Sequence, residues 1–453
     1  MTSKRKMRTG PKRPVRIFSF FGGAATAITL ATAFPVLPSL ANAQTAVVAV
    51  GAQGISDFYA ARQGRPLWFS QDGRQVDALL EILNSAEIDG LRPERYRVDL
   101  LTRAVWAAQA GKPKAVRRAD LMLSQALVYY VRELRQPGDV GVIYVDPELK
   151  PGPPSPRAIL EAAASAPSLE RYVAQMRWTH PVYGELRSAL LSNRNMSPEQ
   201  RDLVRINLER ARELPGGNGR HIVVNTAAQR LFMYENGEAV DSMRVVVGKP
   251  IYPTPMMSAY IRYTALNPYW YVPADLGAER IAPNVVTAGL KYLRQHGYEV
   301  VDHFDPNPKI IDATAIDWQA VADGRTKVLM RQLPGPGNSM GRMKFMFPNA
   351  QGIYLHDTPD KQLLTEASRL FSGGCVRLED APRLARWLYG RDLDPKGAQA
   401  EQKIPLDDKV PVFITYLTAV PNGSDLAFFD DIYGRDRARL TGGWDSGSLA
   451  AAR

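Results

Sequence analysis

The hydrophobic pattern of the chain changes its period once, at a glycine-rich segment near the middle. Before it, segments such as residues 119–134 carry apolar residues at helical spacing. After it, residues 221–225 and 230–234 are short runs of β-branched and aromatic residues, which is typical of strands. Because a helical period does not suit a strand, residues 214–219 (LPGGNG) predict a boundary between a helical domain and a β-rich domain.

Chain length and local pattern divide the two halves further. At 453 residues the chain can hold two or three buried cores. We predict a mostly helical domain over residues 44–217 and a β-rich domain over residues 218–436, which opens with an Asn-Gly hairpin. A helical pattern and an acidic stretch interrupt the second domain over about residues 278–330, which predicts an insertion. Small residues dominate residues 437–453, so we expect a flexible tail and an α+β fold class.

The first 43 residues have the layout of a secretory signal. They carry seven Lys or Arg residues and no acidic residue, with an apolar stretch over residues 17–40. Residues 41–43 (Ala-Asn-Ala) place alanines where a signal peptidase recognises them, so we predict cleavage before Gln44 and Sec-type export to the periplasm. The alternative is an uncleaved signal that anchors the protein to the membrane.

The net charge of +11 comes mostly from this N-terminal segment. Without residues 1–43 the chain keeps 50 basic and 46 acidic residues, a formal charge of +4. No basic run with interleaved aromatic residues follows, which argues against a nucleic-acid partner. A mild positive charge suits an anionic polymer as substrate.

Cys375 is the only cysteine of the chain and lies in the segment FSGGCVRLED. His356 precedes it by 19 positions, in GIYLHDTPD. Exported proteins normally use cysteines in pairs, so a single one is either a reactive thiol or an inert buried residue. Two preceding glycines and a following arginine suit core packing poorly, which favours the reactive thiol.

A cysteine attacks as its thiolate, so its surroundings must favour the charged form. His356, at the end of a predicted strand, is the candidate base, and Arg377 adds positive charge. We also expect a helix over residues 378–389, directly after the cysteine, whose first N–H groups would point at the thiol.

Two glycines before the cysteine point to acyl transfer. Gly373 and Gly374 allow the backbone to approach a substrate closely. The backbone N–H groups of Gly374 and Cys375 are candidates for an oxyanion hole. The chemistry that these residues predict is acyl transfer through a thioester.

The remaining histidines predict no metal site. The chain has no HExxH motif and no cysteine pair, and no phosphate-binding loop either, so we expect neither a metal nor another cofactor. Of the five histidines, only His356 both ends a predicted strand and lies near the cysteine. The others are His180, His221, His296 and His303.

The order of histidine before cysteine, with SxGCxR at the cysteine, resembles the L,D-transpeptidase catalytic domain of bacterial cell-wall enzymes. Further motifs resemble the large periplasmic branch of that family, and the likeness covers nearly all of the chain after the signal. These motifs lie at residues 58–68 (FYAARQGRPLW), 267–273 (NPYWYVP), 331–349, 354–359 (YLHDTP) and 431–436 (DIYGRD).

The resemblance implies a mixed-β catalytic domain at residues 218–436, with a helical lid at about residues 278–330, behind a scaffold domain. It implies attack on the bond between diaminopimelate and the terminal D-alanine of a tetrapeptide stem, followed by transfer to the diaminopimelate of an acceptor stem. The product is a 3–3 crosslink, made in cell-wall biogenesis and degradation and in shaping the cell, by an enzyme that carbapenems acylate. The resemblance implies that Cys375 is the nucleophile and His356 the general base and acid. It implies that Ser372, Gly373 and Gly374 shape the oxyanion hole. Tyr354 and Arg377 would support the substrate and the loop, or have a purely structural role.

Two departures from the family pattern matter. Many members carry a histidine before the Gly-Cys pair, where this chain has Gly373, so the resemblance does not fix the oxyanion-hole geometry, although the Cys–His pair is intact. The large branch also usually has a peptidoglycan-binding module, but only residues 187–219 fill its place. Substrate capture would then depend on the scaffold and the lid.

Alternatives stay open within the same chemistry and outside it. Water or a protein lysine is an alternative acyl acceptor to a second stem, which would make the protein an L,D-carboxypeptidase or an enzyme that attaches proteins to peptidoglycan. A sortase is disfavoured because it usually places its arginine far downstream on another strand, whereas Arg377 lies two residues after the cysteine. Papain-like peptidases are disfavoured because they put the cysteine before the histidine, the reverse of the order here. A non-catalytic scaffold that binds cell-wall synthesis proteins is the alternative of another class.

Overall fold

The computed structural model describes residues 52–442, apart from residues 70–72, 194, 305–306, 396, 398 and 424. The predicted signal peptide and most of the predicted tail lie outside these residues. Everything described belongs to one compact unit. Among the described residues, no helix is both long and apolar enough to cross a bilayer.

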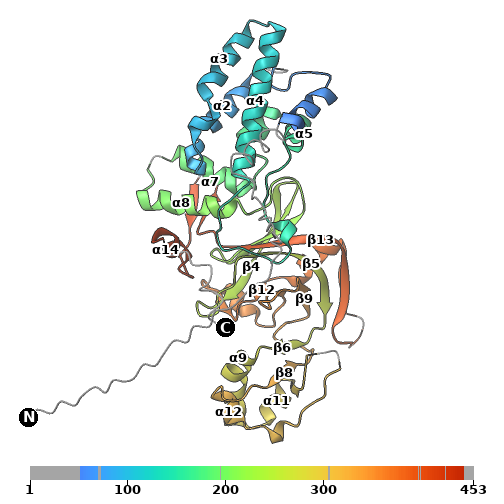
Figure 1. The fold of residues 1–453 in the computed structure, drawn as a ribbon. Coiled ribbons are helices and arrows are strands. Elements are labelled where there is room, and N and C mark those ends of the chain that lie inside the picture. Colours follow the sequence, from blue (N-terminus) through green and yellow to red (C-terminus); the bar gives the residue numbers. More distant parts are fainter. Residues whose placement is uncertain are drawn as a thin grey trace, which may run out of the picture. The chain divides into compact units, whose positions relative to one another are not determined.

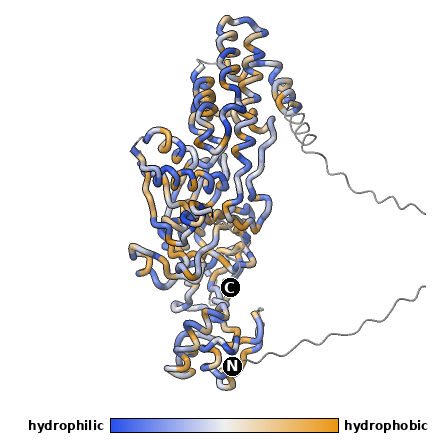
Figure 2. The backbone as a smooth tube through the Cα atoms, turned by 60° about the vertical axis from the view of Figure 1, so that its left-hand side comes forward, coloured by the Kyte–Doolittle hydropathy of each residue, from blue (hydrophilic) through white to orange (hydrophobic). Residues whose placement is uncertain are grey.

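Helices form the first half of the described chain (Figure 1). In α4, Leu123, Leu127 and Leu134 lie at helical spacing on one face and are fully buried. Apolar and polar positions alternate in the same way along the helices at the top of Figure 2. After a helix over residues 52–61 come α2 (Arg74–Asn84), α3 (Val98–Gln109), α4 (Pro113–Leu134), α5 (Pro156–Ser165), α6 (Leu169–Ala174), α7 (Pro181–Ser192) and α8 (Pro198–Ala211).

A buried carboxylate ties these helices together. The Asp89 side chain is fully buried and accepts hydrogen bonds from Tyr130 (2.7 Å) and Tyr183 (2.6 Å). Arg187 Nε lies 2.9 Å from the same carboxylate, and its Nη2 donates to Ser85 Oγ at 2.8 Å. A buried charge is tolerated only when it is paired and hydrogen-bonded, so Asp89 fixes α4 and α7 in one arrangement.

Replacing Asp89 by alanine should therefore destabilise the helical half by about 3–5 kcal/mol, because the Arg187 charge stays buried without its partner. Urea unfolding followed by circular dichroism measures this loss. Asp202→Ala is the control, since Asp202 pairs with Arg205 at 3.0 Å on an exposed surface and should change little. Equal stability of the two variants would contradict the role given to Asp89.

A mixed sheet that closes on itself fills the second half, and one short strand from the first half, at residues 143–144, joins its edge. Its strands are β1 (Ile143–Tyr144), β2 (His221–Asn225), β3 (Arg230–Glu235), β4 (Glu238–Gly248), β5 (Met257–Leu266), β9 (Met343–Met346), β10 (Leu355–His356), β11 (Leu370–Ser372), β12 (Val376–Leu378) and β13 (Gln402–Thr415). The order is β1-β5-β13-β2-β3-β4-β12-β10-β9, and β9 pairs back onto β5, while β11 adds to β4. Ile222, Val245 and Phe345 are fully buried in the core of this closed sheet.

The predicted Asn-Gly hairpin is confirmed. Asn236 and Gly237 have φ values of 53° and 78° between β3 and β4, and Glu235 pairs with Glu238. Both central residues of this turn type need positive φ, which asparagine and glycine adopt most easily.

The helix predicted over residues 378–389 is confirmed over residues 381–389, but it begins three residues later than predicted and does not follow Cys375 directly. Val376–Leu378 forms β12, which pairs with β4 and β10, and helix α13 (Ala381–Tyr389) begins only after it. Val376 and Leu378 are fully buried while Arg377 between them is not, a period of two that belongs to a strand. Asp380 caps α13 by accepting from Arg383 N–H at 3.0 Å, so the helix N-terminus lies beyond the strand and not at the thiol.

The predicted lid segment is a mixed unit with its own core, not a purely helical one. Its strands form a three-stranded sheet in the order β6-β8-β7, and residues such as Trp270, Leu293 and Trp318 share one hydrophobic cluster. The elements are β6 (Trp270–Val272), α9 (Ala274–Leu276), the π-helical η4 (Gly277–Ile281), α10 (Ala282–Ala288), α11 (Lys291–Gln295), β7 (Tyr298–Val301), α12 (Trp318–Ala322) and β8 (Leu329–Gln332). We call this unit the lid.

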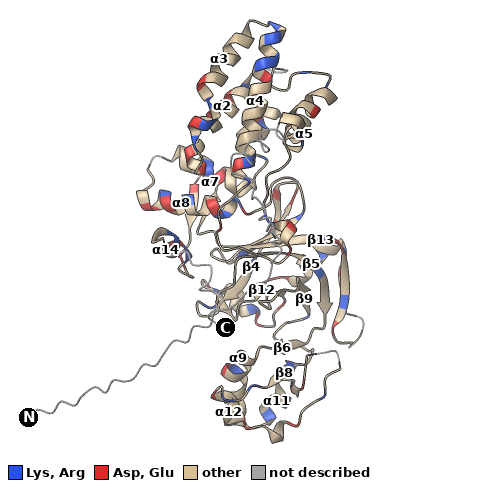
Figure 3. Cartoon of the chain, viewed as in Figure 1, with Lys and Arg blue, Asp and Glu red and all other residues tan. Residues whose placement is uncertain are grey.

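Buried polar contacts join α8 to the end of the closed sheet. Arg210 Nη1 donates to Tyr416 O at 3.0 Å and pairs with Asp436. Asn207 Nδ2 donates to Thr418 Oγ1 at 2.9 Å. The described helices carry basic and acidic residues interspersed (Figure 3).

Candidate active site

The pairing of β9, β10 and β12 separates two faces of the sheet. Phe345, Leu355 and Val376 are register partners and are fully buried in the core. Because neighbouring residues of a strand point to opposite faces, the next row of register partners lies on the other face. That row is Lys344, His356 and Arg377.

Tyr354 and Cys375 belong to this second face as well, because each lies two positions before His356 or Arg377 in the sequence. Tyr354 contacts the cysteine sulfur by hydrogen bonds from its hydroxyl and its backbone N–H. The sulfur also lies 3.5 Å from Gly352 O. The thiol is partly exposed, so a substrate can reach it from this face.

Cys375 is only partly exposed, and the water that it has lost affects the pKa of its thiol. Loss of solvent raises the pKa of the thiol above its ordinary value of 9.0, and this effect outweighs the opposing hydrogen bonds from Tyr354 and the charges of Arg377 and Lys344. The free enzyme therefore holds a neutral thiol at pH 7. This differs from the thiolate expected from the sequence, because that expectation counted the nearby charges and not the desolvation.

His356 lies diagonally across from Cys375 and is 1% exposed. Its Nδ1 lies 2.5 Å from the backbone carbonyl oxygen of Asp357. A carbonyl only accepts, which assigns the proton to Nδ1 and leaves Nε2 as the basic nitrogen. Burial, followed by the charge of Arg377, lowers the pKa of His356 to about 3, so the ring is neutral at pH 7 and its Nε2 carries no proton.

Side-chain hydrogen bonds hold the loop before Cys375. Ser372 Oγ donates to Cys375 O at 2.6 Å and accepts from Gly374 N–H at 3.1 Å. Thr254 Oγ1 donates to Gly374 O at 2.7 Å, and Gly374 has a φ of 113° that other residues rarely adopt. Of the two amides predicted for an oxyanion hole, that of Gly374 is thus used by Ser372. The Cys375 N–H donates to no group within the described residues.

The lid contacts this loop at Gly373. A Cβ atom at this position would lie 3.1 Å from Leu276 Cδ1, so the lid leucine occupies the space that a side chain would take. Tyr252, in the loop after β4, donates to the carboxylate of Glu279 in the lid at 2.9 Å. The lid therefore contacts two loops beside the site: the loop before Cys375 through Leu276, and the loop after β4 through Glu279.

Arg377 faces the same side as the thiol and is mostly buried. Its Nη1 lies 3.2 Å from Asp360. Its Nε has no partner among the described residues, although it is buried. The guanidinium is therefore only partly satisfied, which leaves it able to bind a further acceptor.

Sequence patterns singled out Cys375, His356, Tyr354 and Arg377, and the structure places all four side chains on one face. They did not single out Lys344, whose MKFM context predicts only an ordinary strand position. Thr254 and Leu276 were missed as well, since each lies more than 90 residues from the cysteine in sequence. Strand pairing brings Lys344 to the site, the lid brings Leu276, and the loop between β4 and β5 brings Thr254.

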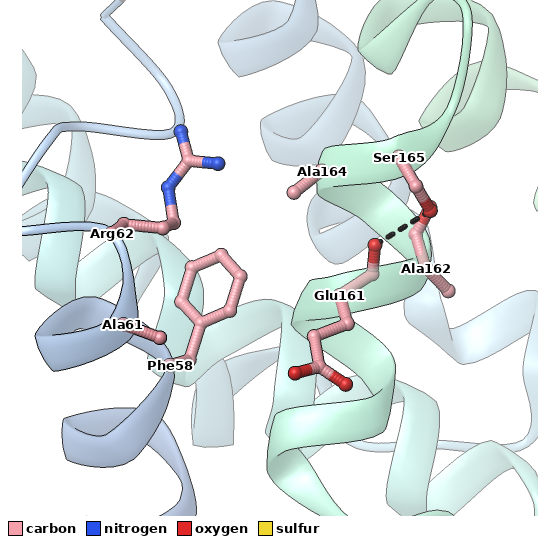
Figure 4. Close-up of a pocket in the computed structure, with 7 residues that line it drawn as sticks. All are labelled: Phe58, Ala61, Arg62, Glu161, Ala162, Ala164 and Ser165. Atoms are coloured by element: carbon pink, nitrogen blue, oxygen red, sulfur yellow. Dashed lines mark hydrogen bonds between the residues drawn. The ribbon is translucent and has the colours of Figure 1, made fainter.

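A cavity of about 450 Å³ lies elsewhere, between the helix over residues 52–61 and α5 (Figure 4). Phe58 and Arg62 line one side, and Glu161 and Ser165 line the other. It contains none of the site residues. Within the described part of the chain, no three His, Cys, Asp or Glu side chains are grouped to hold a metal ion.

Two family models match separate parts of the chain. Residues 219–414 match the YkuD family model, described as the L,D-transpeptidase catalytic domain, and residues 53–190 match a Scaffold domain. A Haemophilus influenzae protein named "Putative L,D-transpeptidase" is 27% identical over 395 residues, which cover 84% of this chain and 78% of that protein.

Two solved structures are also similar. The Ldtfm–avibactam carbamoyl enzyme aligns with 15% identity over 45% of this chain and 51% of its own, at a TM-score of 0.20. An L,D-transpeptidase from Mycobacterium smegmatis aligns with 17% identity over 45% of this chain and 63% of its own, also at 0.20. The match thus spans less than two thirds of the length of either solved chain.

Proposed function

The chain is a member of the L,D-transpeptidase family by its catalytic and Scaffold domains, and from this premise we propose that it forms 3–3 crosslinks in peptidoglycan through an acyl-enzyme on Cys375. The family predicted from the sequence is thereby confirmed. The observation that carries the proposal is the shared face of Cys375 and His356, with the basic Nε2 of a neutral imidazole available on it.

In the first half-reaction, the thiol of Cys375 adds to the carbonyl carbon of diaminopimelate, and its proton passes to His356 Nε2. The oxygen that becomes negative is stabilised by the Cys375 N–H. When the intermediate collapses, the bond to D-alanine breaks and the leaving amine takes the proton from His356. A thioester and free D-alanine result.

In the second half-reaction, the side-chain amine of an acceptor diaminopimelate attacks the thioester. Its proton passes to His356, the carbon–sulfur bond breaks, and the thiol of Cys375 regains a proton. The products are the 3–3 crosslinked dimer and the free enzyme. We place this reaction outside the cytoplasm, with stem peptides as donor and acceptor, since family members act on peptidoglycan.

Purified enzyme incubated with tetrapeptide stems tests the proposal. We expect crosslinked dimers and D-alanine by liquid chromatography and mass spectrometry. Tripeptide without dimer would instead indicate an L,D-carboxypeptidase, and neither product with any stem would overturn the proposed enzyme. Attachment of a lysine-bearing protein is tested by adding such a protein as acceptor and searching for its peptidoglycan adduct.

Replacing Leu276 by alanine should shift the products from dimer to tripeptide. The leucine covers the catalytic loop at Gly373, and its loss opens the thioester to water, which then competes with the acceptor amine. We expect the ratio of tripeptide to dimer to rise several-fold, on the order of 3–10. Val286→Ala is the control, because Val286 is an exposed lid residue. An unchanged ratio in Leu276→Ala would show that this contact does not exclude water.

A further inference from the structure

Lys344 is a charged side chain that the structure buries beside the site, with only 4% of the residue exposed. It lies in β9, where His356 is its register partner on β10. Withdrawing an ammonium group from water is costly unless partners compensate it, so a buried lysine at this position needs an explanation. Neither the packing of β9 nor the reaction described above uses its charge.

The surroundings of Lys344 compensate its charge closely. Its Nζ lies 3.1 Å from the carboxylate of Glu401 and 3.4 Å from Tyr269 O. It also lies 5.5 Å from the ring centre of Tyr271 and 5.6 Å from that of Tyr354, distances at which a cation is attracted to an aromatic ring. The ammonium is thus held in one place on the face that carries the thiol.

Glu401 is held in place by an unusual backbone. It has a φ of 51°, and its N–H donates to the carbonyl of Asn267, which itself has a φ of 45°. The Glu401 carboxylate also accepts from Tyr269 N–H at 2.7 Å. Left-handed backbone at a non-glycine residue such as Glu401 is costly and is concentrated at functional sites. Here it delivers a carboxylate to Lys344.

The ring of Tyr354 connects this pair to the thiol. Its hydroxyl and backbone N–H both hydrogen-bond to the sulfur of Cys375, while Lys344 lies near the same ring. Tyr354 also contacts the ring of His356 at a centroid distance of 5.7 Å. Glu401, Lys344 and Tyr354 therefore form a continuous chain of contacts that ends at the sulfur.

We propose that Lys344 is a positioning residue for the nucleophile: its ammonium, held by Glu401, fixes Tyr354 against Cys375 and favours the negative sulfur once the proton has left. The inference rests on the proposed function of Cys375. The positive charge of Lys344 also lowers the pKa of Cys375, as Coulomb attraction to the thiolate requires. Arg377 acts in the same direction from the opposite register position.

The test is the pH dependence of Cys375 alkylation by iodoacetamide, which needs no stem peptide. We expect Lys344→Met to move the profile to higher pH, with about tenfold less thiolate at a given pH, because a nearby positive charge is lost. Glu401→Gln should move it to lower pH, because the lysine charge is no longer balanced. Lys344→Arg keeps the charge and should stay near the wild-type profile.

Opposite shifts distinguish this role from a structural one. If Lys344 and Glu401 only supported packing, the Lys344→Met and Glu401→Gln profiles would shift in the same direction or would not shift at all. Either result in folded variants would overturn the proposal. Lys403→Met is the control, because Lys403 is an exposed lysine 5.5 Å from the ring centre of Tyr263. If one variant fails to fold, the direction of the other still decides. Wild-type enzyme that alkylates normally but never crosslinks stems would overturn the proposed function alone.

Discussion

Replacing Cys375 by alanine is expected to abolish crosslinking, with a loss of at least ~10⁴-fold in the rate of dimer formation. The whole reaction proceeds through a bond to the sulfur, and no second cysteine exists to replace it. The fold should persist, since the thiol is partly exposed and the loop is held by Ser372 and Thr254. Mass spectrometry of the muropeptide products and thermal melting measure the two quantities.

The same variant tests acylation by a carbapenem directly. Wild-type protein should gain one covalent adduct by intact-mass spectrometry, because the antibiotic presents an acyl carbon to the nucleophile, and Cys375→Ala should gain none. Ser372→Ala is the comparison variant, since it loosens the loop but keeps the sulfur. It should still be acylated, but more slowly than the wild-type protein. If cells that carry only Cys375→Ala retain their 3–3 muropeptides, the protein is a binding scaffold and not the crosslinking enzyme.

Much of the fold follows from local sequence signals. The hairpin of β3 and β4 was predictable because Asn236 and Gly237 suit positive φ, and α4 because its apolar residues repeat at helical spacing. The start of the helix predicted over residues 378–389 was placed three residues too early, since β12 before it is too short for its period to mark where the strand ends. The first part of β13 was missed, because Pro405 and neighbouring acidic residues are poor strand formers.

The site residues also divide into those that local sequence predicts and those that only the folded structure brings together. Tyr354 and His356, like Cys375 and Arg377, are two positions apart, and the alternation of a strand is enough to place each pair on one face. The pairing of β10 with β12 then joins the two pairs. Lys344 reaches the site only through a strand register that no local pattern encodes. The protonation state of the thiol was also out of reach, because it depends on how much water the fold removes.

Replacing His356 by glutamine is expected to slow acylation of Cys375 by about 10²–10⁴-fold at pH 7, the usual contribution of a positioned base. The wild-type reactant is a neutral thiol beside a neutral imidazole. Because the pKa of His356 is lowered to about 3, falling pH does not protonate the base until far below the ordinary value of 6.5. The wild-type rate of acylation should therefore stay level through pH 6.5.

The variant should respond to pH in a different way. Without a base, only those molecules react in which Cys375 has already lost its proton to the solvent. Because the pKa of Cys375 is raised above 9.0, this thiolate fraction, and with it the rate of acylation, should rise about tenfold per pH unit through the neutral range. Stopped-flow acylation by a chromogenic carbapenem between pH 5 and pH 9 (about the range in which the fold should hold) separates the two profiles. His296→Gln, which alters an exposed lid histidine, should follow the wild-type profile. A wild-type inflection at pH 6.5 would instead mean that His356 is solvated and titrates normally, and a level profile in His356→Gln would mean that another group takes the proton.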